Sequence, residues 1–180
     1  MAAICVFCAS SQTLDPRWLA LADQVGAAIG ARGHQLISGG GRVGMMGAIV
    51  EGARKTHAHT LGVIPQALVD LEVADLDSDE LVVTDGMAAR KIVMLERADG
   101  FLILPGGLGT LDELFEVWTL AMLGLHAKPI VLLDVDDFYG GLMTWLSTLA
   151  SQRFIRADGL GMVHVVRSVD EALDEVERFV

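Results

Sequence analysis

The residues best suited to chemistry in this sequence lie in two glycine-rich segments, Gly39–Gly44 and Pro105–Thr110. In the second segment, three glycines within four positions let the backbone turn sharply and expose its amide groups, more glycines than a plain strand-to-helix turn needs. A helix that begins at Thr110 would direct its free N–H groups and the positive end of its dipole into this turn. The segment therefore predicts a cradle for an anion such as phosphate. It lacks the lysine of a P-loop, so we expect no triphosphate chemistry.

The first segment fits the pattern G-x-G-x-x-G between a predicted strand and a predicted helix, which is typical of dinucleotide sites. Two features argue against an NAD site. The segment follows the second predicted strand rather than the first, and the next strand, which ends at Gly62–Pro65, has no acidic residue to hold a ribose. We therefore expect a loop near a ligand, with Gly40, Gly41 and Ser10 as candidate additional contacts.

Charged residues in and near these loops allow two interpretations. Thr110 and Glu113 have the T-x-x-E spacing of a capping box, in which the threonine caps the helix and the glutamate bonds back to the cap. From spacing alone, capping is favoured over catalysis. Arg90 and Lys91 are predicted in the first turns of a helix that is capped by Asp85, where cations oppose the helix dipole. This position indicates an anionic partner, the alternative being a solvated surface pair.

No other pattern indicates a metal site or a nucleophile. Cys5 and Cys8 have a C-x-x-C spacing, but both fall on the first predicted strand, where residues three apart face opposite sides of a sheet. No second cysteine pair completes a zinc site, and no further ligand lies at suitable spacing from His57 and His59. The G-x-S-x-G motif of a nucleophile elbow is absent. We therefore expect no metal ion.

Strands and helices alternate along the whole sequence, which predicts βαβ units and a parallel sheet. We expect a single α/β domain over residues 1–180, with a three-layer Rossmann-like doubly wound sheet. Ligands bind beyond the carboxyl ends of the strands in such sheets, where both glycine segments fall. Asp15 is expected to cap the first helix, Ser168 and Glu171 to form a capping box at the last one, and residues 66–79 to form a loop. The predicted strands are residues 4–8, 34–38, 60–64, 81–84, 101–104, 130–133 and 163–166.

Composition limits the classes of partner. Apolar residues make up 52% of the chain and the mean hydropathy is +0.48, which indicates a sheet buried on both faces and a buried subunit interface. The net charge of −11 disfavours DNA or RNA but allows a small anion held by a few local donors. No apolar run reaches membrane-spanning length, and the start of the sequence lacks the basic region of a signal peptide. We therefore expect a cytoplasmic protein with no membrane partner.

Two motifs occur together in this chain: the Arg-Lys pair at Arg90 and Lys91, and the run P-G-G-x-G-T-x-x-E from Pro105 to Glu113. The combination resembles the Lonely Guy (LOG) family of cytokinin riboside 5′-monophosphate phosphoribohydrolases. Members are often labelled lysine decarboxylases, but this chain has no pattern typical of a pyridoxal phosphate site. The resemblance covers nearly the whole chain, through Ile4–Ser11, Gly39–Gly47, Val63–Leu68 and Gly124–Pro129.

The resemblance implies hydrolysis of the N-glycosidic bond of N6-modified adenosine 5′-monophosphates, which releases the free base, a cytokinin, and ribose 5-phosphate. It implies no cofactor, Arg90 and Glu113 as the catalytic pair, and a homodimer with its sites near the interface. Glu113 would stabilise the positive charge that develops on the ribose. The implied substrate contacts are Glu72, Met87, Arg90, Lys91, Gly107, Leu108, Gly109, Thr110, Leu111, Asp112, Glu113 and Thr119.

Two alternatives stay open from the sequence. One is a broader nucleosidase acting on nucleoside 5′-monophosphates, and the other is a non-catalytic protein that binds a nucleotide or the molybdenum cofactor. The chain has Ala88 and Ala89 where the LOG family commonly has polar residues, and this departure bears on recognition of the base.

Overall fold

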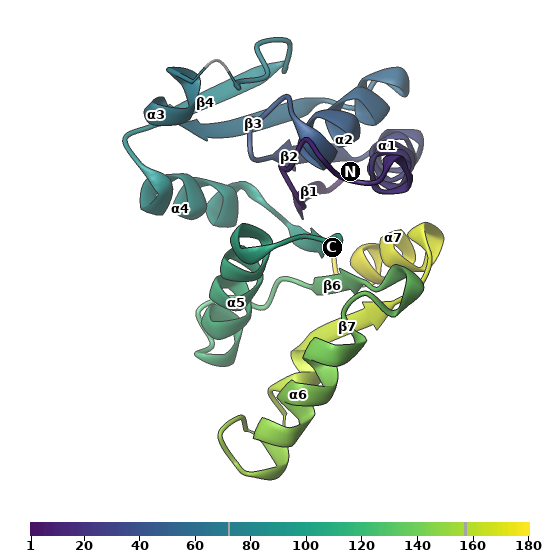
Figure 1. The fold of residues 1–180 in the computed structure, drawn as a ribbon, viewed down its shortest axis with the longest axis vertical. Helices are drawn as coiled ribbons and strands as arrows, with labels where there is room; N and C mark the ends of the chain where they lie inside the picture. Colours follow the sequence, from purple (N-terminus) through teal and green to yellow (C-terminus); the bar gives the residue numbers. More distant parts are fainter. Residues whose placement is uncertain (72, 157) are drawn as a thin grey trace.

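The strands form one parallel sheet in the computed structural model, in the order β4-β3-β2-β1-β5-β6-β7 (Figure 1). The structure describes residues 1–71, 73–156 and 158–180. The strand order runs outward in both directions from β1, which pairs with β2 on one side and with β5 on the other. This reversal is the topological switch point at which doubly wound sheets bind ligands. The strands are β1 (Ala3–Phe7), β2 (Gln35–Ser38), β3 (Thr60–Pro65), β4 (Glu80–Thr84), β5 (Gly100–Ile103), β6 (Ile130–Leu133) and β7 (Val163–Val166).

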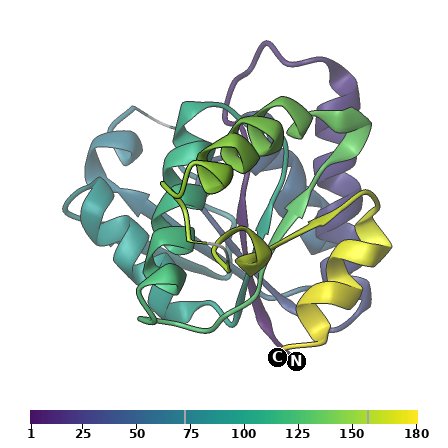
Figure 2. The same cartoon turned by 90° about the horizontal axis from the view of Figure 1, so that it is seen from below.

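Helices cover both faces of the sheet and make the three layers expected from the sequence (Figures 1 and 2). One core lies under α1, α2 and α7, and the other lies under α4, α5 and α6. Strands β5 and β6 are buried at every position, as parallel strands covered on both faces must be. The helices are α1 (Pro16–Ala31), α2 (Gly44–Lys55), α3 (Gln66–Val69), α4 (Met87–Arg97), α5 (Leu108–Met122), α6 (Gly140–Ser151) and α7 (Val169–Glu177), with 3₁₀ turns at Val135–Asp137 and Leu160–Met162.

Alternation along the first strand separates the two cysteines as the sequence predicted. Cys5 lies in the core under α4 and α5, whereas Cys8, one residue beyond the end of β1, lies in the core under α1 and α2. Both are buried free thiols. They therefore cannot act as a redox pair in this fold.

Capping residues set the start of the first and last helices. Asp15 accepts a hydrogen bond of 3.0 Å from the backbone N–H of Arg17, and Pro16 is the first residue of α1. Ser168 and Glu171 make both bonds of a capping box at the start of α7. These two predictions are confirmed. The two ends of the chain lie side by side, next to the start of β1 (Figure 2).

Two local predictions were wrong. Helix α4 begins at Met87 after Gly86 and has no side-chain cap, so Asp85 does not cap it. Residues 66–79 are not all loop, because the four residues of α3 follow directly on β3. Such a short helix leaves no periodic signal in a sequence. Among the described residues, no helix is both long enough and apolar enough to cross a membrane.

Candidate active site

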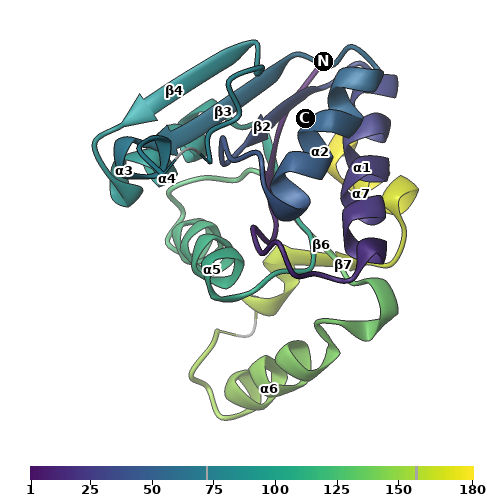
Figure 3. The same ribbon diagram turned by 45° about the horizontal axis from the view of Figure 1, so that its top comes forward.

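A cavity of about 500 Å³ opens at the carboxyl ends of β1, β2, β3 and β5. Its walls come from the loops after these strands and from the first turns of α2, α4 and α5. Figure 3 shows that α2 and α5 lie on opposite sides of the sheet, so the cavity receives groups from both layers. Its glycine, hydroxyl and charged lining residues are Ser10, Ser11, Gly39, Gly41, Arg90, Gly107, Gly109, Thr110, Asp112 and Glu113.

Arg90 and Glu113 form a buried ion pair in the wall of this cavity. The Arg90 Nη1 donates to Glu113 Oε1 at 3.0 Å, and the two side chains are only 7% and 10% exposed. The other two nitrogens of the guanidinium also have partners: Nε donates to the carbonyl of Val63 at 3.0 Å, and Nη2 donates to the carbonyl of Gly39 at 3.3 Å. The arginine is therefore fixed by the ends of β2 and β3 as well as by α5.

The surroundings of Glu113 favour its protonated form. Burial raises the pKa of this carboxyl above its ordinary value, and the charge of Asp112 raises it further, while Arg90 and Lys91 act in the opposite direction. The net effect is a raised pKa. A carboxylate with a raised pKa is a stronger base than an ordinary glutamate, and its charge acts with little screening. These are the properties required to orient or deprotonate a water molecule.

The capping-box prediction for Thr110 and Glu113 was wrong. Helix α5 begins at Leu108, with Gly107 in the cap position and no side-chain cap, so Thr110 lies within the first turn. Glu113 bonds to Arg90 instead of to a cap amide. The chain enters the helix two residues earlier than predicted because a glycine occupies the cap position. This leaves the first amides of α5 without side-chain acceptors.

The start of α5 has the properties of an anion cradle. The N–H groups of residues 108–110 belong to the first turn and have no intrahelical partner. A side-chain carbon placed on Gly107 or Gly109 would meet no atom within 4 Å, so the backbone there borders open space. The helix dipole adds partial positive charge at the same point. The start of α5 therefore remains the predicted site for an anion, although the helix begins two residues earlier than predicted.

The hydroxyl group of Tyr139 holds the loop that precedes this cradle. Tyr139 is 2% exposed, and its Oη donates to the carbonyl of Leu104 at 2.7 Å. The same oxygen is hydrogen-bonded by the backbone of Gly106. Burial raises the pKa of this phenol, so it stays protonated and continues to donate. The turn from β5 into α5 is thus fixed at two positions, Leu104 and Gly106.

The first glycine segment is closed by other parts of the protein. The amide of Asp75 donates to the carbonyl of Gly40 at 2.9 Å, and the amide of Arg42 donates to the carbonyl of Val73 at 2.8 Å. The carboxylate of Asp75 is in turn held by Arg54 and by Ser78. Residues 73–78 are thus fastened over this loop.

Lys91 points to a neighbouring groove between α4 and α5 rather than into the main cavity. Its Nζ lies 3.1 Å from Asp112 and 2.5 Å from Glu116, and these two carboxylates raise its pKa. The groove has a volume of about 230 Å³ and is mostly apolar, with Ile92 and Val117 among its lining residues. Lys91 therefore connects α4 to α5 next to the ion pair of Arg90 and Glu113.

The structure brings most of the predicted site residues together. Ser10, Gly41, Met87, Arg90, Gly107–Thr110, Asp112 and Glu113 all line the cavity, while Gly40 lies buried in the adjoining loop. Glu72 lies outside the described residues.

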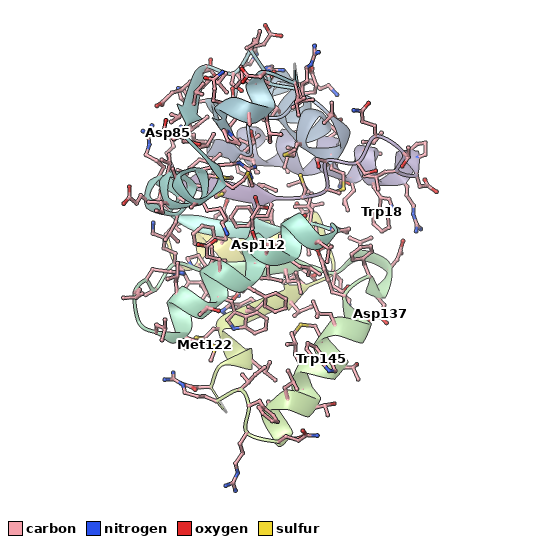
Figure 4. All side chains as sticks on the ribbon, turned by 60° about the vertical axis from the view of Figure 1, so that its left-hand side comes forward. Trp18, Asp85, Asp112, Met122, Asp137 and Trp145 are labelled. Carbon is pink, nitrogen blue, oxygen red and sulfur yellow. The ribbon has the colours of Figure 1, made fainter. Side chains whose placement is uncertain are left out.

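Besides Lys91, two predicted contacts lie outside the main cavity. Leu111 packs against the core under α5. Thr119 is exposed, two turns along α5 from Glu113, and lines a separate apolar hollow with Trp145 of α6. Figure 4 shows this end of α5, at the labelled Met122, beside α6. Within one chain, Thr119 is therefore not part of the cavity.

Sequence reasoning missed the apolar half of the cavity. These side chains come from α2, from the end of β3 and from the segment that follows it. A single sequence gives no signal for them, because apolar residues at such positions are as common in a core as in a binding site. They are Met46, Ile64, Leu68, Leu71 and Val73. No group of three or more metal-ligating side chains occurs among the described residues.

Comparison with known proteins places this chain in a family. A family model described as "possible lysine decarboxylase" matches residues 46–176. The cytokinin riboside 5′-monophosphate phosphoribohydrolase of Mycobacterium marinum is 49% identical over 170 residues, which is 94% of this chain and 90% of that protein. The enzyme of the same name from Mycobacterium tuberculosis is 47% identical over the same shares of each chain.

Among solved structures, the molybdenum cofactor carrier protein of Chlamydomonas reinhardtii has a TM-score of 0.74 at 24% identity, covering 99% of this chain and 97% of that chain. This likeness shows the fold alone. The sequence relatives show the family as well, because they match almost the entire chain and are identical to it at close to half of the aligned positions. The chain belongs to the Lonely Guy (LOG) family of phosphoribohydrolases.

Proposed function

We propose that this protein hydrolyses the N-glycosidic bond of N6-modified adenosine 5′-monophosphates, releasing the free base, a cytokinin, and ribose 5-phosphate. The observation that carries this proposal is the juxtaposition of two groups in one cavity. The open start of α5 supplies amides for a phosphate, and the buried pair of Arg90 and Glu113 supplies a carboxylate of raised pKa. The names of the relatives agree with this chemistry.

In the proposed reaction, the phosphate binds at residues 107–110, and the ribose extends from there toward Glu113. The bond between the ribose C1′ and the base nitrogen breaks, and the base leaves with the electron pair. The carboxylate of Glu113 stabilises the positive charge that develops on the ribose and accepts a proton from the attacking water, whose oxygen bonds to C1′. Arg90 keeps Glu113 in place through the 3.0 Å contact. The departing base takes up a proton from solvent, and Glu113 returns the proton that it accepted to solvent, so that one water molecule is consumed.

The apolar half of the cavity supports an N6-modified base. A phosphate at one end and a carboxylate in the middle leave Leu68, Leu71 and Val73 to surround the far end of the substrate. Burial of an alkyl substituent there would contribute about 0.8 kcal/mol for each CH₂ group. Neither alternative drawn from the sequence receives comparable support, since the molybdenum cofactor carriers share only the fold.

The description "possible lysine decarboxylase" is not supported by the lining of the cavity. Pyridoxal phosphate enzymes bind their cofactor through a lysine. The described residues that line this cavity include no lysine, and Lys91 is engaged by two carboxylates outside it.

The direct test is to incubate the purified protein with a panel of nucleotides and detect free base and ribose 5-phosphate. N6-isopentenyladenosine 5′-monophosphate should react fastest, AMP more slowly, and the matching nucleoside slowest. Each lost charge-assisted hydrogen bond costs about 1.5–3 kcal/mol, and a phosphate accepts several, so the nucleoside should be at least about 100-fold slower. Equal rates for the nucleotide and its nucleoside would overturn the role of the cradle.

Assembly and location complete the proposal. The apolar groove between α4 and α5, together with exposed Ile92 and Leu108, supports a homodimer in which this surface is covered. A second copy would also be the way for Thr119 to reach a substrate. Light scattering should give a mass near twice 19.2 kDa at micromolar concentration. Two buried free thiols are compatible with a reducing compartment such as the cytoplasm, which cell fractionation would test.

A further inference from the structure

The geometry points to Gly39 as a positioning residue for the proposed reaction: its missing side chain makes the space in which the guanidinium of Arg90 sits. This inference rests on the proposed function for its catalytic consequence, although the packing itself does not depend on it. Gly39 is the first residue of the segment whose pattern resembles a dinucleotide site. In the structure, this glycine makes room for the side chain of Arg90 and not for a dinucleotide.

Position 39 requires a glycine because a larger residue would overlap Arg90, and not because of its backbone conformation. Gly40 and Gly44 have φ angles of +71° and +59°, in the left-handed region that favours glycine, whereas Gly39 does not. A side-chain carbon built on Gly39 would overlap Nη2 of Arg90 and would lie 3.2 Å from its Cζ. The nearest other atom would be the Sδ of Met46 at 2.9 Å, which is part of a flexible side chain.

The carbonyl of the same residue is one of the supports of the guanidinium. Gly39 O accepts from Nη2 at 3.3 Å, Val63 O accepts from Nε at 3.0 Å, and Glu113 accepts from Nη1 at 3.0 Å. Because Arg90 is only 6% exposed, it has no solvent-facing alternative position that keeps all three bonds. A methyl group at residue 39 would displace Nη2, and because the guanidinium is planar and rigid, Nη1 and its bond to Glu113 would move with it.

The consequence falls on turnover rather than on binding. The cradle at residues 107–110 comes from another strand–helix connection, so displacement of Arg90 leaves it intact. Gly39→Ala should therefore lower kcat by at least about 100-fold, while KM for the nucleotide changes by less than about threefold. A general weakening of the fold would instead lower the active fraction without changing the kcat of the molecules that remain folded.

A matched control is available on the other face of the sheet. A side-chain carbon on Gly30 of α1 would overlap the Oγ1 of Thr56 in the same way, far from the cavity. Gly30→Ala should lower the melting temperature or leave it unchanged, and kcat per folded molecule should stay within about twofold of the wild type. Equal losses of kcat in Gly30→Ala and Gly39→Ala would assign the effect to stability alone and overturn the inference.

The decisive experiment is a double-mutant cycle between Gly39→Ala and Arg90→Ala, read by both melting temperature and kcat. If the two residues act through one contact, Gly39→Ala should destabilise the wild type but have little effect in the Arg90→Ala background, where the overlapping group is gone. The kcat of the double variant should lie within about threefold of that of Arg90→Ala. Additive effects in both measurements would overturn the inference.

The two proposals can fail separately. A wild-type protein that releases no base from any nucleotide would overturn the proposed function, but the cycle in melting temperature would still test the packing of Arg90 against Gly39. Conversely, hydrolysis by the wild type with a fully active Gly39→Ala variant would leave the proposed function standing and reject the positioning role.

Discussion

The two glycine-rich segments, Gly39–Gly44 and Pro105–Thr110, have similar sequence patterns but different surroundings in the folded protein. Each follows a buried strand and precedes a helix. In the first, neighbouring residues occupy the polar groups: Arg90 bonds the carbonyl of Gly39, and Asp75 bonds the carbonyl of Gly40. In the second, the backbone at residues 107–109 borders open space. Glycine in the first segment makes room for the protein, and glycine in the second leaves room for a ligand.

This difference divides the site into a catalytic part and a binding part that can be changed separately. The first segment supports the buried pair of Arg90 and Glu113, so changes there should act on turnover. The second segment presents amides to the phosphate, so changes there should act on affinity. A variant in the first segment that changed only affinity, or a variant in the second that changed only turnover, would contradict this division.

The largest effect is expected from Glu113→Gln. The amide oxygen can still accept the bond from Arg90 Nη1, but the side chain loses its charge and its ability to take a proton. Turnover should fall by about 100-fold or more, while affinity for the nucleotide stays within a few-fold, because the cradle is unchanged. The measurement is base release by the purified variant, together with nucleotide binding and a thermal melt.

Glu175→Gln provides the matched control for that variant. Glu175 is buried to the same extent as Glu113, at 8% exposed, and its carboxylate also has side-chain partners, His164 and Arg178, but it lies on α7. This variant should lose stability and keep its turnover. If Glu113→Gln hydrolyses nucleotide at the wild-type rate, Glu113 has no part in the chemistry.

The second prediction concerns Gly109→Ala, which should make the protein more stable and its binding weaker. Alanine favours a helix over glycine by about 0.5–1 kcal/mol, and a methyl group at this position meets no protein atom. It would project into the space assigned to the phosphate, so KM for the monophosphate should rise at least about tenfold while the rate with the nucleoside is unchanged. Steady-state kinetics on both substrates give the comparison.

Gly141→Ala controls for the effect on the helix. Gly141 is the second residue of α6, as Gly109 is of α5, and a side chain there also meets nothing within 4 Å. Both variants should gain stability, but only Gly109→Ala should lose affinity for the monophosphate. A parallel loss of affinity in Gly141→Ala would show that the cradle does not lie at α5.

The third prediction uses pH to test the catalytic part. Because burial and Asp112 raise the pKa of Glu113, the acid limb of kcat/KM should lie above the ordinary range of a glutamate. Asp112→Asn should move this limb to lower pH, because a negative neighbour of Glu113 is removed and Lys91 loses one of its two carboxylate partners. A limb that does not move would mean that another group controls it.

The same raised pKa has a consequence for folding. The folded protein holds the proton of Glu113 more tightly than the unfolded chain does, so this group favours folding at low pH. Its contribution is lost as the pH rises through the folded pKa. Arg90 limits this loss because it pairs with the carboxylate form.

The sequence predicted the fold well because its signals were local and repeated. The alternation of strands and helices, the cap at Asp15 and the capping box at Ser168 each specify one element independently of the rest. The elements that were predicted wrongly have weak local signals. Helix α3 has only four residues, and α5 begins at a glycine cap that offers no side-chain hydrogen bond.

The candidate site was predictable only in part, because its residues come together through tertiary contacts. The sequence and its resemblance to the LOG family named Arg90 and Glu113, but the spacing T-x-x-E favoured a capping box over the ion pair that forms. Nothing in a single sequence shows that Gly39 faces a guanidinium or that Leu68 and Leu71 line the cavity. These contacts join residues from separate strand–helix connections.

The smallest effect is expected from Tyr139→Phe, which tests whether the second segment must be held rigid in order to bind. The variant keeps the ring and its packing but removes the hydroxyl that donates to Leu104 O at 2.7 Å. A buried carbonyl left without a donor costs about 1–3 kcal/mol of stability. Part of this cost should appear as a looser cradle, with KM for the monophosphate raised about two- to fivefold and kcat nearly unchanged. Thr60→Val is the control, because it removes a buried hydroxyl that bonds Asp79 at the opposite end of β3. If both variants lose similar stability but only Tyr139→Phe raises KM, the turn into α5 binds phosphate because it is held in place. An equal KM for both variants would mean that the free amides of α5 suffice without this support.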